Sequence, residues 1–428
     1  MTGRRSTPTF LRPRRTRATM LSAGALVASA SLAAGCGVVS GVTGGSGDDT
    51  VTVMTMAPEN TKATNKPGMP AMAKAYARWV NKGGGINGRR LNVITCNERN
   101  DSVSATECAR RAVKEDVVAV VGSYSQYGRS FLSPLEAAGI PYIGGYGLTD
   151  DEFTSPLSYP VNGGQPALLA GLGRELARNC GPVTLVRPDT IAGDELPVLL
   201  DSGLSAGRHT EAGDQRAADD ATEYSRHAER AVERATSDPT GKKGCVVPAL
   251  GDRTSTFMDS FRRIADEYPS VRTATVLGSV DQSVINATGR TYEGSYVTGW
   301  YPASSDARWD AMRDVIQKEA FGDNRIDASD AGVQTTWIAY EVLRKTIESL
   351  GDGEVTARTV RRALDDGLKI ETGGLTPTLS WAFSDLIAAS GFPRVINSNV
   401  TFQVVRKGQL VAARKGFTNV SRILENAS

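Results

Sequence analysis

Residues Gly83–Cys96 read GGGINGRRLNVITC, and this stretch decides which fold class the chain can adopt. Gly83, Gly85 and Gly88 match the pattern G-x-G-x-x-G, in which glycines let a backbone approach the pyrophosphate of a dinucleotide. That chemistry needs the glycines to follow a strand and to open a helix. Here they follow residues 69–82, which have helical periodicity, and they precede the strand-like run RLNVITC. The pattern therefore predicts a helix end and a turn, and not a phosphate-binding loop.

Strand-like and helix-like segments alternate along the chain on both sides of this turn. One series runs from residue 51 to 147, and a second series of similar layout runs from about residue 165 to 301, with a weak strand or none in residues 211–224. Helical segments then fill residues 306–368, and a strand-like segment follows at 399–416. This alternation predicts an α/β fold with parallel sheets whose apolar strands are buried on both faces.

The composition is typical of a globular protein. The chain has 428 residues, of which 40% are hydrophobic and 22% charged, so it is long enough for two domains with sizeable cores. The formal net charge of +2 gives no general attraction to nucleic acid or to acidic lipid. We therefore expect no nucleic-acid partner.

The N-terminal segment differs in composition from the rest of the chain. An arginine-rich start is followed by the charge-free segment MLSAGALVASASLAAGCG, residues 20–37, which is too short for a comfortable membrane span. These features predict a secretory signal peptide over residues 1–35. Its ending, AAGC, resembles a bacterial lipobox and makes Cys36 the expected lipidation site, with residues 36–50 as anchor and flexible tether. Secretion with a free Cys36 is the alternative, and Arg14-Arg15 leaves the Sec and twin-arginine export routes both open.

Four further cysteines, an even number, agree with an oxidising compartment. None of them forms a C-x-x-C pair or has a histidine at metal-ligand spacing, so we expect two disulfides and no metal site. Four cysteines allow three pairings, and the residue pattern alone leaves all three open. The cysteines are Cys96, Cys108, Cys180 and Cys245.

Several phrases in the expected order resemble a known family. GGGINGRRLNVITCNERND, followed by a helix and by VVAVVGSYSQYGRSFLSPLEAAGIPYIGGYG, is similar to the type I periplasmic binding proteins. The group it resembles most is the leucine-binding-protein-like group, which serves ABC uptake systems for branched-chain amino acids. The C-terminal VTFQVVRKGQLV resembles the closing strand pair of that family. The resemblance extends from Val51 to about Gly416.

The resemblance implies two Rossmann-like lobes that are joined by three hinge crossings and that bind a small solute in the cleft between them. We expect the crossings near Tyr159–Asn162, Thr298–Tyr301 and Thr376–Trp381. The implied domains are lobe one, residues 51–160 with 300–378; lobe two, residues 161–299 with 379–416; and a C-terminal tail, residues 417–428.

The strand order of such lobes also implies a disulfide pairing. In a 2-1-3-4-5 sheet the first and third strands are neighbours, so Cys180 and Cys245, each just before a strand, would lie close together. Cys96 at a strand end would meet Cys108 on the following helix. The resemblance therefore predicts the pairs Cys96–Cys108 and Cys180–Cys245.

In members that bind amino acids, two loops of lobe one hold the ligand carboxylate through backbone N–H and hydroxyl groups. The corresponding loops here are Ser123–Tyr127 and Gly145–Thr149, and both can offer donors at a helix N-terminus. The alternative is that their tyrosines only cap the sheet. The candidate ligand-binding residues in these loops are Ser123, Tyr124, Ser125, Gln126, Tyr146 and Thr149.

Lobe two and the hinge supply the remaining candidates. Asp281 lies one position from an acidic residue that usually accepts the ligand ammonium, so it is the expected specificity residue. The loop Gly251–Thr254 lies where relatives place an aromatic contact, and this sequence has Arg or Thr instead; Asp252 and Arg253 of this loop are candidates. The secondary candidates are Asp189, after a strand, and Trp300, at a hinge. The departures at Gln126, Arg253 and Asp281 argue against a branched-chain amino acid and leave another amino acid, an amide or another small polar solute.

Enzymatic function is the main rival. No H-E-x-x-H or P-loop motif occurs in the sequence, so we expect no enzyme and no cofactor. The expected partners are a small polar solute, an ABC permease and ATPase, and a membrane contacted through the lipid anchor only. A ligand-sensing ectodomain that signals to a receptor or kinase would have the same fold and stays an alternative.

Overall fold

The computed structural model describes residues 50–62, 64–190, 192–218, 220–239, 241–389 and 391–427. The expected signal peptide, Cys36 and nearly all of the expected tether lie outside the described residues, so these expectations stay predictions. Among the helices that the structure describes, none combines the length and the apolar composition needed to cross a bilayer.

The first of two sheets has five parallel strands in the order β2-β1-β3-β4-β5. This order is one of the two common arrangements of doubly wound α/β folds, in which ligands bind beyond the carboxyl ends of the strands. The expected α/β fold class is confirmed. The strands are β1 (Thr50–Ala57), β2 (Arg90–Asn97), β3 (Ala119–Val121), β4 (Tyr142–Ile143) and β5 (Ser158–Tyr159).

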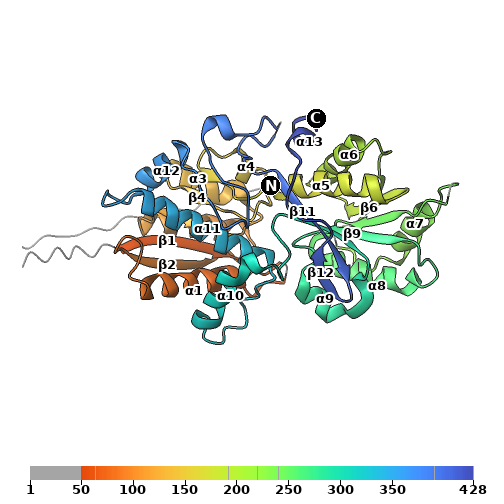
Figure 1. Cartoon of the computed structure of the whole chain (residues 1–428), viewed down its shortest axis with the longest axis horizontal. Coiled ribbons are helices and arrows are strands. Elements are labelled where there is room, and N and C mark those ends of the chain that lie inside the picture. Colours follow the sequence, from red (N-terminus) through yellow and green to blue (C-terminus); the bar gives the residue numbers. More distant parts are fainter. Residues whose placement is uncertain are drawn as a thin grey trace, which may run out of the picture. The chain divides into compact units, whose positions relative to one another are not determined.

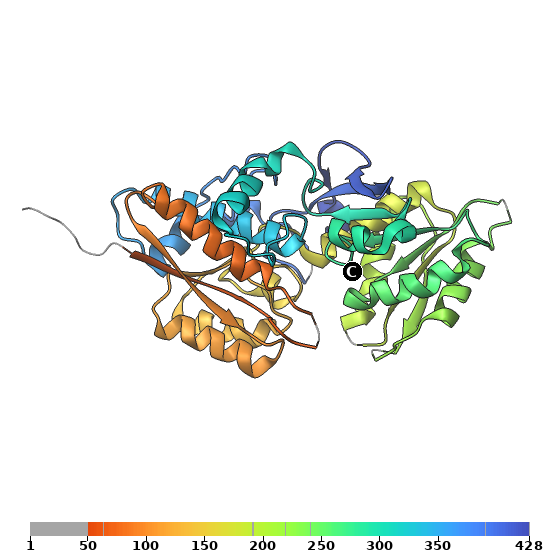
Figure 2. The same ribbon diagram turned by 90° about the horizontal axis from the view of Figure 1, so that it is seen from below.

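Helices cover both faces of this first sheet (Figure 2). On one face Val51 and Val53 of β1 pack against α1 and α11. On the other face Met54 and Met56 pack against α2 and α3. Because successive strand residues point to opposite faces, burial of both faces explains why β1 is apolar at odd and at even positions. The helices are α1 (Gly68–Lys82), α2 (Ser102–Lys114), α3 (Gly128–Ala138), α4 (Asp151–Thr154), α10 (Asp310–Glu319), α11 (Ala331–Ser349) and α12 (Ala357–Asp365).

The glycine-rich stretch is the turn between α1 and β2, as the order of its flanking segments predicts. Helix α1 ends at Lys82, and Gly83 forms its C-cap. Gly85 has φ +81°, and a Cβ there would lie 2.1 Å from the carbonyl oxygen of Arg89, so only glycine allows this close approach. The chain then enters β2 at the amino edge of the sheet, which is the edge opposite the one where ligands bind.

The second sheet has eight strands, with the path β12-β11-β10-β9-β8-β6-β7 and β13 paired to β11. Its parallel part repeats the 2-1-3-4-5 order, and β11 and β12 add an antiparallel pair. Residues 211–224, where the sequence indicates a weak strand or none, contain β7. The strands are β6 (Val183–Pro188), β7 (Gly213–Ala217), β8 (Cys245–Pro248), β9 (Arg272–Val276), β10 (Tyr296–Gly299), β11 (Asn399–Arg406), β12 (Gln409–Ala412) and β13 (Thr418–Asn419).

Helices again cover both faces of the second sheet (Figure 1). Leu185 faces the core formed with α5 and α6, while Val186 faces α7 and α8. The segment expected to be a polar tail forms β13 and α13, and Leu424 of α13 is buried in the same core as α5. The helices are α5 (Gly164–Asn179), α6 (Glu195–Ala206), α7 (Ser225–Ala235), α8 (Thr254–Ala265), α9 (Gln282–Thr288) and α13 (Ser421–Glu425). Short 3₁₀ helices are η1 (Ala192–Asp194), η2 (Gly251–Arg253), η3 (Gly289–Tyr292), η4 (Ala307–Trp309) and η5 (Phe383–Asp385).

The chain passes between the two sheets after β5, after β10 and before β11. Tryptophan and asparagine side chains bind the backbone at these passages. Trp381 donates through Nε1 to the carbonyl of Pro160 at 3.1 Å, and Asn397 donates to that of Val161 at 3.0 Å. These bonds join the third passage to the first one, so the connecting segments form one hydrogen-bonded group.

Both disulfides have the pairing that the family resemblance implies, Cys96–Cys108 and Cys180–Cys245. For Cys180–Cys245 the reason is the strand order: β6 and β8 are neighbours, and Val183 of β6 is in register with Cys245. Cys96–Cys108 joins the end of β2 to the helix α2 that follows it. The pairing prediction is confirmed.

Candidate ligand-binding site

A cavity of about 150 Å³ lies where loops from the carboxyl ends of both sheets meet. The first sheet contributes the segments after β1, β3 and β4, and the second contributes those after β8 and β9, together with the start of α5. An apolar cavity of about this volume is enough for a benzene-sized molecule. The cavity shares Gln126, Leu148 and Gln165 with a wider outer cavity of about 600 Å³.

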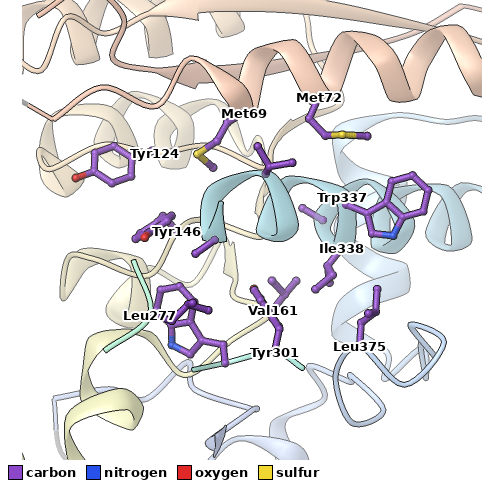
Figure 3. Packing of buried hydrophobic residues seen from close by; sticks show 14 of the residues in the cluster. Met69, Met72, Tyr124, Tyr146, Val161, Leu277, Tyr301, Trp337, Ile338 and Leu375 are labelled. Carbon is purple, nitrogen blue, oxygen red and sulfur yellow. The ribbon is translucent and has the colours of Figure 1, made fainter. Parts of the chain in front are cut away.

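Three aromatic rings form one wall of the inner cavity. Tyr124 and Tyr146 follow β3 and β4, and their ring centroids are 5.1 Å apart (Figure 3). The ring of Trp300, which follows β10, lies edge-on to Tyr146 at 5.3 Å. The Nε1 atom of Trp300 donates to the carbonyl of Gly164 at 2.9 Å, which fixes the indole at the start of α5. This wall offers a largely apolar, aromatic surface to a small solute.

Lys66, in the loop between β1 and α1, supplies a buried cation to the same cavity. Its side chain is only 14% exposed, and its Nζ lies 5.5 Å from the ring centroid of Tyr146 and 3.1 Å from Oδ2 of Asp330. Burial acts to lower the pKa of Lys66, but the charge of Asp330 and the hydrogen bond to it raise the pKa to a net value above the ordinary one. Burial raises the pKa of Tyr146. The lysine is therefore cationic and the tyrosine neutral at physiological pH.

Lys66 is a site residue that sequence reasoning missed. It lies in the sequence NKPGMP, which has no motif and no periodicity. The signal that could have found it is its position, because it follows the first strand and the carboxyl end of that strand faces the ligand in this fold.

The loop Gly145–Thr149 is held by a buried carboxylate. Glu152 accepts hydrogen bonds from the backbone N–H groups of Gly147 at 3.0 Å, Leu148 at 2.9 Å and Thr149 at 3.1 Å. Burial raises the pKa of Glu152, and these hydrogen bonds oppose that rise. Three backbone donors of this candidate loop are thus occupied by a side chain of the protein.

Two predicted site residues, Ser123 and Ser125, point into the protein and do not line the cavity. The Ser123 hydroxyl accepts from the N–H of Met56 at 3.0 Å. The Ser125 hydroxyl donates to Glu98 at 2.9 Å and accepts from the N–H of Tyr127 at 3.1 Å. Their side chains therefore position the loop after β3, and direct contact of either one with a ligand stays a prediction.

Gln126 and Thr149 lie further out than the aromatic wall. Gln126 lines both cavities, and its Nε2 donates to the phenolic oxygen of Tyr124 at 3.2 Å. Thr149 lines the outer cavity only, together with Arg253, whose Nη1 donates to the carbonyl of Ala221 at 2.8 Å. These side chains surround the entrance to the inner cavity.

The acidic candidates divide into one that lines the cavity and two that do not. Asp252 lines the inner cavity, is exposed, and accepts a hydrogen bond from the hydroxyl of Thr64 across the cavity. Asp281 lines neither cavity; it caps α9, where it accepts from the N–H of Val284 at 3.0 Å. Asp189 is also outside both cavities, and it lies 3.7 Å from Arg216. A role for Asp281 or Asp189 in binding stays a prediction.

The structure therefore brings five predicted residues together around the inner cavity. Lys66, Thr64 and Gln165 join them as polar lining that the sequence did not indicate. Within the part of the chain that the structure describes, no group of three or more His, Cys, Asp or Glu is placed to hold a metal ion. The five residues are Tyr124, Gln126, Tyr146, Asp252 and Trp300.

Comparison with known families assigns the chain to a class of proteins. A family model described as periplasmic binding protein matches residues 61–387, which is more than half of the chain. The chain belongs to the periplasmic binding protein family. This family consists of solute-binding proteins, so the chain is a binding protein and not an enzyme.

Solved structures share the fold at low sequence identity. A substrate-binding periplasmic protein from Ralstonia solanacearum has 15% identity and a TM-score of 0.66, over 85% of this chain and 99% of that one. A solute-binding protein of an ABC transporter from Rhodopseudomonas palustris BisB5, in complex with 3,4-dihydroxybenzoic acid, has 14% identity and a TM-score of 0.68, over 87% and 98%. A branched-chain amino acid ABC transporter protein from Thermus thermophilus with bound valine has 15% identity and a TM-score of 0.67, over 87% and 97%. A search of curated proteins found no significant match to the sequence.

Proposed function

We propose that this protein captures a small polar solute in the cavity between its two sheets and delivers it to an ABC permease with its ATPase. The observation that carries the proposal is the cavity itself, because its lining comes from the carboxyl ends of strands in both sheets. Its volume of about 150 Å³ has room for a solute of the size of an amino acid, an amide or a small aromatic molecule.

The structural relatives support this size range and the transport role. One is a solute-binding protein of an ABC transporter with 3,4-dihydroxybenzoic acid, and another is a branched-chain amino acid ABC transporter protein with valine. We propose that the present chain has the same role in solute uptake as these relatives. A solute of either chemistry would have room in the inner cavity.

We propose further that the two lobes, residues 51–160 with 300–378 and residues 161–299 with 379–416, close around the solute by a hinge movement. The hydrogen bond between Thr64 and Asp252 supports this proposal, because it joins the segment after β1 to the segment after β8. The proposed ligand contacts are the side chains that line the inner cavity and the loops that carry them.

The proposed location is outside the cytoplasmic membrane, with a lipid on Cys36 as the only membrane contact. The arginine-rich start, the apolar segment and the AAGC ending support it. Replacing Cys36→Ser in the full chain should move the protein from the membrane fraction to the soluble fraction. A Cys36→Ser protein that stayed with the membrane would refute the anchor.

A thermal-shift screen of the chain from about Gly37 onward tests the binding function. The screen should contain amino acids, their amides, aromatic acids, sugars and nucleosides. A true ligand raises the melting temperature in proportion to the logarithm of its concentration above Kd, because it binds only the folded state. If no compound raised the melting temperature, the solute-binding proposal would fail.

A further inference from the structure

Lys66 is the most deeply placed charge of the inner cavity. Of the described lining residues, Lys66 and Asp252 are the charged ones. Asp252 is exposed and is hydrogen-bonded to Thr64, whereas the Lys66 side chain is 14% exposed and its Nζ lies over the ring of Tyr146. A solute in the inner cavity therefore meets a cation at depth and an acid at the rim.

The ion pair with Asp330 does not cancel this charge towards the cavity. Asp330 does not line the cavity, and its Oδ1 accepts from the N–H of Val333 at 2.9 Å as the N-cap of the 19-residue helix α11. The positive end of the helix dipole offsets part of the Asp330 charge. An ammonium has three donors, and only one is needed for the 3.1 Å bond to Asp330.

The backbone N–H groups of one cavity loop are already occupied. The N–H groups of Gly147, Leu148 and Thr149 all donate to Glu152, which is 2% exposed. A solute carboxylate could reach these donors only by displacing the buried side chain of Glu152. Glu152 is held close to them because it follows Thr149 by three residues in the chain. Of the charged side chains that line the inner cavity in the described structure, Lys66 is the one that can pair with a solute anion.

We infer that Lys66 determines the charge specificity of the site and that the solute is a small molecule carrying a carboxylate, which binds Lys66. This inference rests on the proposed solute-binding function and adds the chemical class of the solute. The Tyr146 ring beside Nζ limits where the carboxylate can lie, so the rest of the solute contacts the aromatic wall. An ammonium group on the solute is not required.

Acid and amide pairs test the inference by calorimetric titration. Benzoate and benzamide are both flat and nearly equal in size but differ in charge, and L-valine is included as a zwitterion. We expect at least one carboxylate to bind and benzoate to bind more tightly than benzamide. Replacing Lys66→Met should weaken the bound carboxylate roughly tenfold to a hundredfold, the usual range for one charge-assisted hydrogen bond, and should leave benzamide unchanged.

Two matched variants separate binding from stability. Asp330→Asn breaks the same ion pair but keeps the cation and an N-capping side chain, so it should retain carboxylate binding. Lys66→Met with Asp330→Asn leaves no unpaired charge and should lose carboxylate binding as the single Lys66→Met variant does. Lys74→Met, on the exposed side of α1, controls for loss of a lysine elsewhere. Melting temperatures of all four variants report their folding.

The outcomes are distinct. Weakening by Lys66→Met but not by Asp330→Asn supports the inference. Equal binding of benzoate and benzamide, or a carboxylate affinity that Lys66→Met leaves unchanged, overturns the inference and leaves the solute-binding function intact. Equal weakening by both single variants also overturns it, because the ion pair would then act only on structure. If no compound of the wider screen bound at all, the proposed function would fail, and this inference with it.

Discussion

A Cβ atom on Gly278 would lie 2.2 Å from the phenolic oxygen of Tyr146, far inside the distance that carbon and oxygen tolerate. Gly278 follows β9 of the second sheet, and Tyr146 follows β4 of the first one. The tyrosine ring cannot move away easily because it packs against Tyr124 and Trp300. Contact between the two sides of the cavity thus depends on the absence of a side chain at position 278.

Replacing Gly278→Ala should weaken binding of the solute at least tenfold and lower the melting temperature. The added methyl group collides with Tyr146, and φ +96° at this position is unfavourable for alanine, which costs about 1–2 kcal/mol. Calorimetric titration of the solute found in the thermal-shift screen measures the change in Kd.

Two further variants test the collision. Gly278→Ala combined with Tyr146→Phe should recover part of the affinity, because phenylalanine lacks the oxygen that collides. Gly289→Ala is the matched control: Gly289 has φ +64° but open space around it, so this variant should lose stability without losing affinity. Equal loss of affinity at positions 278 and 289 would contradict the collision.

Replacing Glu152→Gln should destabilise the protein by about 1–3 kcal/mol. The two carboxylate oxygens serve three backbone N–H groups: Oε2 accepts from Gly147, and Oε1 accepts from Leu148 and Thr149. An amide has one acceptor oxygen and an NH₂ group, so at least one buried N–H loses its partner. Urea unfolding measures the loss. Glu136→Gln, on the exposed face of α3, is the control and should change stability by less than about 0.5 kcal/mol.

Replacing both Cys180→Ala and Cys245→Ala should lower the free energy of unfolding by about 2–4 kcal/mol. This disulfide closes a loop with a sequence separation of 65, whereas Cys96–Cys108 has a separation of 12. In the chain-entropy model the longer loop contributes about 1.5 kcal/mol more than the shorter one.

The solute affinity should not change when this disulfide is removed, because Cys180 and Cys245 precede β6 and open β8 at the amino ends of those strands. Denaturant unfolding of this double variant and of a second one, Cys96→Ala with Cys108→Ala, gives the order of stabilities, and titration gives Kd. A tenfold loss of affinity without Cys180–Cys245 would mean that the amino edge of the second sheet shapes the cavity.

The sequence predicts those parts of the fold that depend on local periodicity and on strand order. The turn at Gly83–Gly88 follows from the types of segment on either side of it. The family resemblance implies the disulfides: Cys180–Cys245 from the neighbouring first and third strands, and Cys96–Cys108 from a strand end and the following helix. The sequence of β7, GDQRA, is polar and therefore predicts a weak strand or none. The strand forms because pairing with β6 supplies its backbone hydrogen bonds. Tertiary pairing there outweighs a weak local preference.

The cavity could be predicted less well from the sequence, because its buried lysine pairs with a residue that is distant in the sequence. Lys66 forms its ion pair with Asp330, which is 264 residues further along the sequence, and no local sequence pattern links the two residues. Glu152 did carry a signal: Thr149 and Glu152 have the spacing of a capping box, T-x-x-E, in which the glutamate reaches back to a backbone N–H. Asp281 stands directly before α9, which is a favoured place for an N-cap aspartate.

Replacing Asp306→Asn should lower stability at neutral pH but not in strong acid. Hydrogen bonds from Arg308, including Nε–Oδ1 at 2.9 Å and Nη2–Oδ2 at 2.8 Å, lower the pKa of Asp306 to about 2. The folded-state pKa lies below the unfolded value, so the stabilisation is complete above about pH 4 and is lost as the pH falls through about 2. Because the side chain is about one-third exposed, we expect a contribution of about 1 kcal/mol and not the full value of the shift. Scanning calorimetry at pH 7, 4 and 2.5 should show that the difference in stability between wild type and Asp306→Asn shrinks only below pH 4.

The control is Asp310→Asn, which removes a 68% exposed partner of Arg313 and should differ little in stability from wild type at any of these pH values. An effect of Asp306→Asn that did not depend on pH would contradict the ion-pair explanation.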